Sequence, residues 1–134
     1  MSEEDRERGD RLKVKYNDKG LIAAIVQDVD SGRVLMLGWM NDEALRQTLA
    51  TGKATFYSRS RGKIWVKGES SGHTQELIEA SIDCDQDAVL LRCKSRGPAC
   101  HVGYQSCFYR AIVDGENLKF VDQPVFDPDQ VYKT

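Results

Sequence analysis

The sequence predicts a single α+β domain in which a mostly antiparallel sheet is accompanied by few short helices. Three observations lead to this fold class. Short apolar, β-branched runs recur along the chain, polar turn residues separate them, and one segment combines a helix cap with helical spacing. With 134 residues, the chain is long enough to enclose one hydrophobic core.

The first predicted elements are two strands and a helix. Residues 21–29 are apolar and β-branched, residues 30–33 supply a turn, and residues 34–40 form a second apolar run. Asn41 can cap a helix whose first turn carries acidic side chains, and Gly52 is placed to end it. We therefore expect a largely buried hairpin followed directly by one helix.

The middle of the chain predicts a second hairpin. Residues 54–58 and 64–67 read as short strands on either side of a basic turn at residues 59–63. Residues 68–73 are rich in glycine and serine, so we expect a loop there.

Two more hairpins are expected further along. Residues 76–82 fit either a helix or a strand, but their β-branched residues favour a strand that pairs with the apolar run 88–93 around an acidic turn. Residues 108–113 and 118–121 flank Asp114-Gly115, which is a strong hairpin signal.

Composition and charge argue against two classes of partner. The 19 basic and 21 acidic residues give a net charge of −2, and a broad nucleic-acid-binding surface usually needs a basic excess. No stretch approaches the roughly 18 apolar residues that span a membrane. We therefore expect neither nucleic acid nor membrane as a partner, although a local basic pocket for a phosphorylated small molecule remains compatible with the charge.

The N-terminal residues 1–11 are highly charged and lack the apolar core of a signal peptide. We expect them to form a mobile polar tail in front of a single domain over residues 12–134. A cytoplasmic location follows. In that reducing compartment, the four cysteines are expected to be thiols or metal ligands rather than disulfides.

An acidic motif, Asp83-Cys84-Asp85-Gln86-Asp87, lies at the expected turn. In an extended chain the three carboxylates point to one side and the thiol to the other. A straight strand would separate the outer two aspartates by about 13 Å, so the chain must bend, or a partner chain must contribute, for one ion to be bound. A hard cation site and an exposed acidic hairpin tip are both compatible with this pattern.

Three of the cysteines, Cys84, Cys100 and Cys107, are candidates for a metal site. Three thiolates can hold zinc and leave its fourth position for water, as a hydrolase requires. No C-x-x-C pair is present, which argues against a small structural zinc module. Packing in the core is the other interpretation, and Cys93, which lies in an apolar run, fits it. For the three candidates, the residues alone leave both interpretations open.

A basic and aromatic segment follows the predicted helix. It carries Arg59, Arg61, Lys63, Trp65 and Lys67, and the loop after it contains Ser71 and Gly72. Arginine suits bidentate phosphate recognition, lysine supplies a point charge, and tryptophan can stack on a heterocycle. The other interpretation is a solvated hairpin edge with charged side chains.

Taken together, these segments closely resemble the phosphoribosyl-AMP cyclohydrolases, enzymes of histidine biosynthesis. The matching stretches are GWMN (38–41), FYSRSR (56–61), IWVKGE (64–69), SGHTQ (71–75), DCDQD (83–87), GPACHVG (97–103) and SCF (106–108). They occur in the family's order over roughly residues 21 to 110, and several long motifs in one order are very specific.

The resemblance implies an activity and an assembly. The expected enzyme is a hydrolase that opens the purine ring of 1-(5-phosphoribosyl)-AMP at the N1–C6 bond by a zinc-activated water. The product is the phosphoribosyl-formimino aminoimidazole carboxamide ribotide. The resemblance also implies an intertwined homodimer with active sites at the interface, where both chains build the zinc site.

The resemblance assigns metal ligands by position. It implies that Zn²⁺ is bound by Cys84, Cys100 and Cys107, and that Mg²⁺ is bound by Asp83, Asp85 and Asp87. The expected substrate-binding residues are Arg59, Arg61, Trp65, Lys67, Ser71 and Gly72. His101, beside a zinc ligand, is the first candidate for proton transfer and His73 the second, and either histidine can instead orient a ligand.

Two other functions remain open from the residues. One is a zinc-stabilised binding module that turns over no substrate. The other is a different zinc hydrolase acting on nucleotide bases, although the H-x-E and P-C-x-x-C motifs of zinc deaminases are missing from the sequence.

Overall fold

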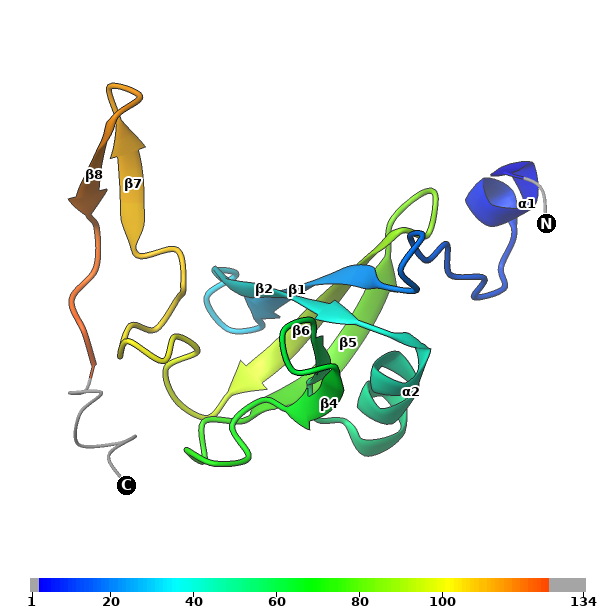
Figure 1. Cartoon of the computed structure of the whole chain (residues 1–134), viewed down its shortest axis with the longest axis horizontal. Coiled ribbons are helices and arrows are strands. Elements are labelled where there is room, and N and C mark those ends of the chain that lie inside the picture. Colours follow the sequence, from blue (N-terminus) through cyan, green and yellow to red (C-terminus); the bar gives the residue numbers. More distant parts are fainter. Residues whose placement is uncertain (1–2, 126–134) are drawn as a thin grey trace.

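A four-stranded sheet lies at the centre of the computed structural model, which describes residues 3–125 (Figure 1). Its strands, in spatial order, are β2 (Val34–Met40), β1 (Ile22–Asp28), β6 (Ala88–Ser95) and β5 (Gln75–Ile82). β1 and β6 run parallel, whereas β1–β2 and β5–β6 are antiparallel.

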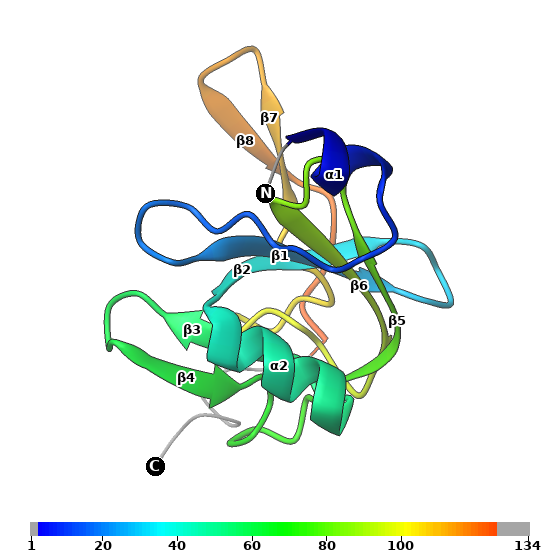
Figure 2. The same cartoon turned by 90° about the vertical axis from the view of Figure 1, so that its right-hand side faces the viewer.

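The other elements surround this sheet. They are α1 (Glu3–Arg8), α2 (Asp42–Thr51), β3 (Thr55–Ser58), β4 (Lys63–Val66), β7 (Arg110–Val113) and β8 (Asn117–Phe120). Helix α2 contacts β2, β5 and the β3–β4 hairpin, whereas the β7–β8 hairpin extends away from the sheet (Figures 1 and 2). No helix of residues 3–125 is long and apolar enough to cross a membrane.

The predicted α+β class and the strand-rich architecture are confirmed within the described residues. The predicted helix is also confirmed, with both of its caps. The Asn41 side chain accepts a hydrogen bond from the backbone of Ala44 at 2.8 Å. Gly52 has a φ of 76° and donates its N–H to the Thr48 carbonyl at 2.9 Å. Glycine adopts this left-handed conformation without the steric cost that a Cβ adds.

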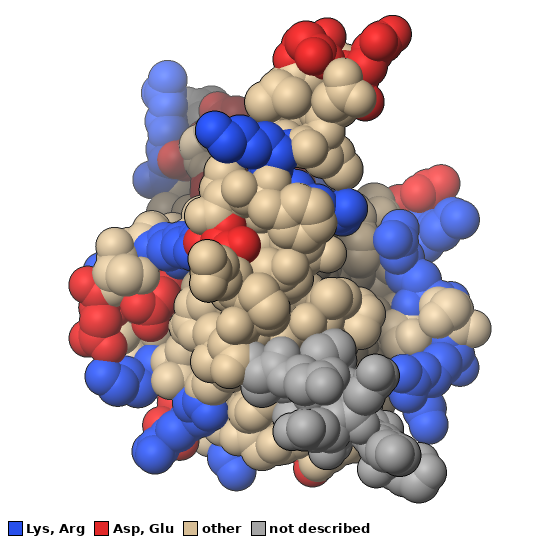
Figure 3. All heavy atoms as spheres, turned by 90° about the vertical axis from the view of Figure 1, so that its left-hand side faces the viewer, with Lys and Arg blue, Asp and Glu red and all other residues tan. Residues whose placement is uncertain are grey.

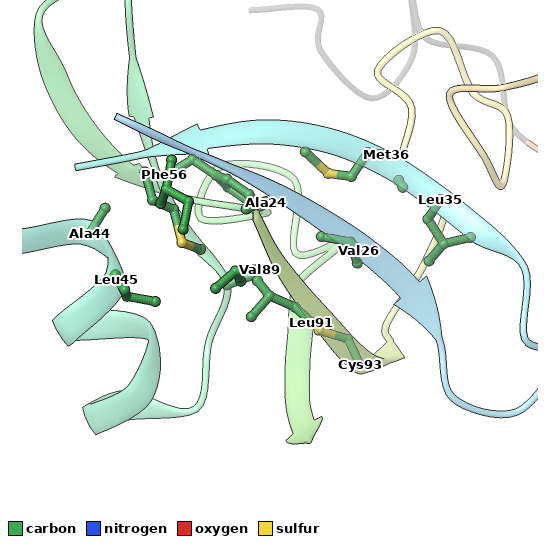
Figure 4. Packing of buried hydrophobic residues seen from close by; sticks show 14 residues of the cluster. Ala24, Val26, Leu35, Met36, Ala44, Leu45, Phe56, Val89, Leu91 and Cys93 are labelled. Carbon is green, nitrogen blue, oxygen red and sulfur yellow. The ribbon is translucent and has the colours of Figure 1, made fainter. Parts of the chain in front are cut away.

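The buried core explains how β6 comes to lie beside β1. Val26 of β1, Leu35 of β2 and Leu91 of β6 are fully buried and belong to the same hydrophobic cluster as Phe56 of β3 (Figure 4). Cys93 is also fully buried in this cluster, and burial raises the pKa of its thiol to about 12. The predicted packing role of Cys93 is therefore confirmed.

Two features of the fold differ from a simple series of hairpins. The parallel β1–β6 pair brings the acidic turn hairpin into the sheet of the first hairpin, a pairing that strand patterns do not specify. Residues 3–8, in the segment predicted as a mobile tail, form helix α1. The mobility of residues 1–11 and the domain boundary at residue 12 stay predictions.

The β7–β8 hairpin exposes large apolar side chains. Phe108 before it, Ile112 in β7 and Phe120 in β8 are 55%, 77% and 59% exposed. Figure 3 shows this side of the molecule, where uncharged side chains occupy the middle of the face and lysine and arginine side chains flank it. Such a surface is typical of a protein–protein contact.

Candidate active site

The acidic motif forms a tight turn between β5 and β6. Asp83 donates its N–H to the Ala88 carbonyl, and Gln86 donates its N–H to the Asp83 carbonyl, both at 3.0 Å. Gln86 adopts a positive φ of 58°. This turn supplies the bend that the sequence required, since one ligand oxygen from each of Asp83, Asp85 and Asp87 lies within 4.8 Å of the others.

The turn gives its carboxylates different pKa values. Partial burial acts to raise the pKa of Asp83, but hydrogen bonds from Asp87 and Ala88 outweigh it and hold that pKa below its usual range. Side-chain hydrogen bonds with Asp85 and then Asp83 raise the pKa of Asp87 to about 6. The crowded carboxylates therefore favour a shared proton, which a divalent cation can replace.

Two of the three candidate zinc ligands lie together in the loop before β7. Cys100 donates its N–H to the Tyr104 carbonyl at 3.1 Å, and Cys107 donates its N–H to the Leu35 carbonyl at 2.7 Å. Although Cys107 reaches the surface, burial of its thiol and then the neighbouring Cys100 raise its pKa to about 11. The two thiols are thus within interaction distance of each other.

Ser106 holds this loop against β2, a role that the sequence analysis missed. Its hydroxyl donates to the Val34 carbonyl at 2.8 Å and accepts from the Phe108 N–H at 2.9 Å. The Ser106 side chain is fully buried. Its position directly before Cys107 was the available signal, but a serine in a loop motif does not reveal burial.

Cys84 lies apart from the other two thiols. It is exposed in the acidic turn, and the only group of three potential metal ligands that residues 3–125 bring together is the aspartate cluster. The three candidate zinc ligands therefore do not converge within the described part of one chain.

A pocket of about 500 Å³ collects several of the predicted substrate residues. Arg61, Trp65, Lys67 and Ser71 line it, together with His101. Trp65 and Lys67 come from β4 and the residue after it, and the ammonium nitrogen of Lys67 lies 5.9 Å from the Trp65 ring centroid. The pocket thus combines two cations, an aromatic face and an imidazole.

Lys67 connects this pocket to the thiol pair. Burial lowers the pKa of its ammonium group, while the charges of Cys107 and Cys100 act in the opposite direction. A cation beside two sulfur atoms offsets the negative charge that develops when they ionise. Ser70, from the loop expected to offer hydroxyls and backbone N–H groups, also lines the pocket, as does Glu69, for which the sequence suggested no binding role.

Three of the predicted substrate-binding and proton-transfer residues are not among the residues that line this pocket. The Arg59 guanidinium lies 5.0 Å from the Trp39 ring centroid. Gly72 donates its N–H to the Gly68 carbonyl at 2.7 Å and so closes the loop. His73 packs against Gly97, where an added Cβ would lie only 2.5 Å from the His73 ring.

Comparisons with known proteins agree on one family. The family model described as phosphoribosyl-AMP cyclohydrolase matches residues 36–109, a range that contains all the motifs from GWMN to SCF. A protein named phosphoribosyl-AMP cyclohydrolase from Chlorobaculum parvum is 51% identical over 133 residues, covering 98% of this chain and 97% of its own.

Two further relatives carry the same name. The Hyphomonas neptunium protein is 61% identical over 104 residues, which cover 78% of this chain and 79% of that protein. The Rhizorhabdus wittichii protein is 58% identical over 117 residues, which cover 87% of this chain and 94% of that protein. The similarity therefore extends beyond the motifs to most of each chain.

Proposed function

The chain belongs to the phosphoribosyl-AMP cyclohydrolase family, and we propose that it hydrolyses 1-(5-phosphoribosyl)-AMP at the N1–C6 bond in histidine biosynthesis. The observation that carries this proposal is the basic, aromatic pocket beside the Cys100–Cys107 pair. A biosynthetic enzyme of this kind supports a cytoplasmic location.

Magnesium fits the aspartate cluster. Asp83, Asp85 and Asp87 offer oxygen ligands, which Mg²⁺ prefers, and these oxygens already lie within 4.8 Å of one another. The raised pKa of Asp87 reflects carboxylates too close to ionise independently. A divalent cation would relieve that repulsion and supply positive charge for a phosphate group of the substrate.

Zinc fits the thiol pair together with a third cysteine. Cys100 and Cys107 offer two soft ligands that lie side by side. Cys84 is exposed and apart from them, so we assign the third ligand to Cys84 of a second copy in a homodimer. The exposed apolar side chains of the β7–β8 hairpin support such an assembly. When bound, zinc supplies Lewis-acid activation of water.

The pocket residues bind and orient the substrate. Arg61 and Lys67 offer cations for the two phosphate groups, and Trp65 offers its indole face to the purine. We assign Arg59, Ser71 and Gly72 to the walls of the phosphate-binding region. The phosphoribosyl group on N1 gives the ring an amidinium-like charge, which makes C6 electrophilic.

The reaction requires proton transfers, of which His101 can perform one. Hydrolysis adds the oxygen of water to C6, which becomes a carboxamide carbon, and breaks the N1–C6 bond. One proton of the water goes to N1, which remains in the formimino group, and the other is released as the amidinium-like charge is lost. His101 lines the pocket next to Cys100, and imidazole both accepts and donates protons near neutral pH. His73 does not line the pocket, which favours His101 for this role.

The test is the ultraviolet change on mixing zinc- and magnesium-loaded protein with phosphoribosyl-AMP. We expect turnover by the wild type and by Cys93→Ala, which loses only a core thiol, but not by Cys100→Ala. The Cys93→Ala assay is run at low temperature because core truncation costs stability.

No turnover by a folded, metal-loaded wild-type dimer would contradict the proposal. The chain would then be better described as a zinc-stabilised binding module. Equal losses in Cys93→Ala and Cys100→Ala would instead contradict the choice of zinc ligands.

A further inference from the structure

The side chain of Gln86 has no part in the proposed chemistry, yet it is only 4% exposed and lies within the acidic turn. We propose that Gln86 is a positioning residue that fastens the N-terminal segment, residues 6–13, to the acidic turn. Docking of this segment and binding of Mg²⁺ by the three aspartates then strengthen each other. This inference rests on the proposed magnesium site.

Every polar atom of the Gln86 side chain contacts the backbone of that segment. Its amide nitrogen donates to the Arg6 carbonyl at 3.0 Å and to the Arg11 carbonyl at 3.2 Å. Its amide oxygen accepts from the Lys13 N–H at 2.6 Å. The Gln86 backbone carbonyl accepts from the Lys15 N–H at 2.7 Å. A buried amide satisfied in this way holds both partners in one geometry.

The N-terminal segment is itself folded back around these contacts. The Arg6 guanidinium donates to the Lys13 carbonyl at 3.0 Å, which closes the segment on itself. Helix α1 lies beside the turn between β5 and β6 in both cartoon views (Figures 1 and 2). Between segment and turn lies a hollow of about 380 Å³, whose walls include Arg11, Asp83 and Cys84. The docked segment therefore borders the proposed metal ligands.

The backbone of Gln86 links these contacts to the carboxylates. Its positive φ of 58° is unfavourable for a residue with a Cβ, and such a conformation persists only where its surroundings hold it. This residue sits between Asp85 and Asp87, and its N–H donates to the Asp83 carbonyl at 3.0 Å. Its conformation therefore sets the relative positions of all three carboxylates.

The coupling has an electrostatic reason. Three negatively charged carboxylates whose ligand oxygens lie within 4.8 Å of one another repel, and that repulsion acts to open the turn. The Gln86 contacts resist opening, so they keep the ligands in place before the cation arrives. If docking of the segment raises the affinity of the turn for the cation by some factor, binding of the cation must raise the equilibrium constant for docking by the same factor.

The test compares Mg²⁺ binding by three full-length, zinc-loaded proteins in titration calorimetry with Mg²⁺ alone. Gln86→Gly removes the side-chain contacts but accepts the positive φ, so the turn is not forced out of its conformation. Gln27→Ala is the matched control, because it removes a glutamine that bonds the Gly32 carbonyl in the β1–β2 turn. We expect the wild type and the control to agree and Gln86→Gly to bind Mg²⁺ about tenfold to a hundredfold more weakly.

A second measurement separates coupling from a merely structural effect. Amide hydrogen exchange at Lys13 and Lys15 is followed with and without Mg²⁺. We expect Mg²⁺ to slow exchange at both amides in the wild type and to have no effect on them in Gln86→Gly. The inference would be overturned if the exchange rates in the wild type did not change with Mg²⁺. It would also be overturned if Gln86→Gly bound Mg²⁺ as tightly as the wild type.

The same titration keeps the two proposals apart. Asp85→Asn reports on the magnesium site itself. If the wild type bound Mg²⁺ no better than Asp85→Asn, the proposed magnesium site would fail, and the coupling with it. If only Asp85→Asn were impaired, the magnesium site would stand and the role of Gln86 would not.

Discussion

Lys67 is the side chain that joins the two chemical parts of the candidate site. It lines the candidate substrate pocket, and the charges of Cys107 and Cys100 act to raise the pKa of its ammonium group. Three thiolates on a divalent zinc ion leave a net charge of −1, which opposes ionisation of a bound water. A cation at this position would offset part of that charge, so we propose a second role for Lys67 beside the proposed phosphate binding.

Replacing Lys67 tests this dual role. We expect Lys67→Met to lower kcat by about a hundredfold, the size of effect seen when a preorganised charge is removed from a reacting centre. Lys67→Arg keeps the charge and should retain more activity. Steady-state ultraviolet assays over a range of substrate concentrations measure kcat and KM. A raised KM with unchanged kcat would mean that Lys67 only binds the substrate.

The pKa of Asp87 predicts a pH dependence of stability in the metal-free protein. Folding raises this pKa from its usual 3.8 to about 6, so the folded state favours the protonated carboxyl. That contribution is fully present below pH 3.8 and is lost as the pH rises through about 6. The pKa of Asp83 is lowered, so its contribution to stability is present above pH 3.8 and is lost only as the pH falls below that value.

Urea unfolding at a series of pH values measures this effect. Without Mg²⁺, the urea concentration at the midpoint of unfolding should decrease as the pH rises from about 4 to about 6, because the contribution of Asp87 is lost. The midpoint should recover when Mg²⁺ is added. Asp87→Asn, which cannot titrate, is the control. A wild-type profile identical to that of Asp87→Asn would contradict the shared-proton description.

At the level of elements, the loop before β7 is held by two sets of contacts. Ser106 fastens it to β2, and Tyr104 stacks on Tyr109 with ring centroids 3.7 Å apart. Phe120 of β8 packs against both rings at 6.3 and 5.9 Å. These contacts fix the loop that carries Cys100 and Cys107.

Ser106→Ala tests the anchor on β2. Loss of the hydroxyl leaves the Phe108 N–H without this acceptor and should cost about 1–3 kcal/mol of unfolding free energy. Ser81→Ala is the matched control, since Ser81 is exposed in β5. Urea unfolding of the two variants supplies the comparison, and equal stabilities would show that Ser106 is not an anchor.

At the scale of the whole molecule, the separation of Cys84 from the other two thiols is the main feature. One described chain brings together the aspartates and a two-cysteine pair, but not three cysteines. In a two-fold symmetric dimer, each site can take Cys84 from one copy and Cys100 with Cys107 from the other.

Mixed dimers test this arrangement. Cys84→Ala and Cys100→Ala should each be inactive alone, but a dimer of the two variants contains one complete set of zinc ligands. Co-expression should therefore restore about a quarter of wild-type activity, because half of random dimers are mixed and each has one working site. Mixed dimers purified with two different tags and found inactive would contradict shared sites.

Local structure was predictable from local pattern. The two strands of the first hairpin, the capped helix and the hairpin around Asp114-Gly115 all form where turn residues and apolar periodicity indicate. The chemical classes of ligand could also be predicted from the residue types, since carboxylates, thiols and an arginine–tryptophan segment each have their own preferred partners. The role of Gln86 could not be predicted, because nothing in its immediate neighbours reveals a contact with a segment 73 residues earlier.

The sequence by itself therefore determined most of the elements, though not helix α1, together with the family and the types of chemical group that this protein offers. Tertiary structure decided the parallel β1–β6 pairing, the grouping of the aspartates and the meeting of Cys100 with Cys107 beside Lys67. The physical reason is the distance along the chain over which each kind of interaction acts. Propensity, capping and turn preferences act between near neighbours, whereas these arrangements depend on burying a shared core between segments far apart in the chain.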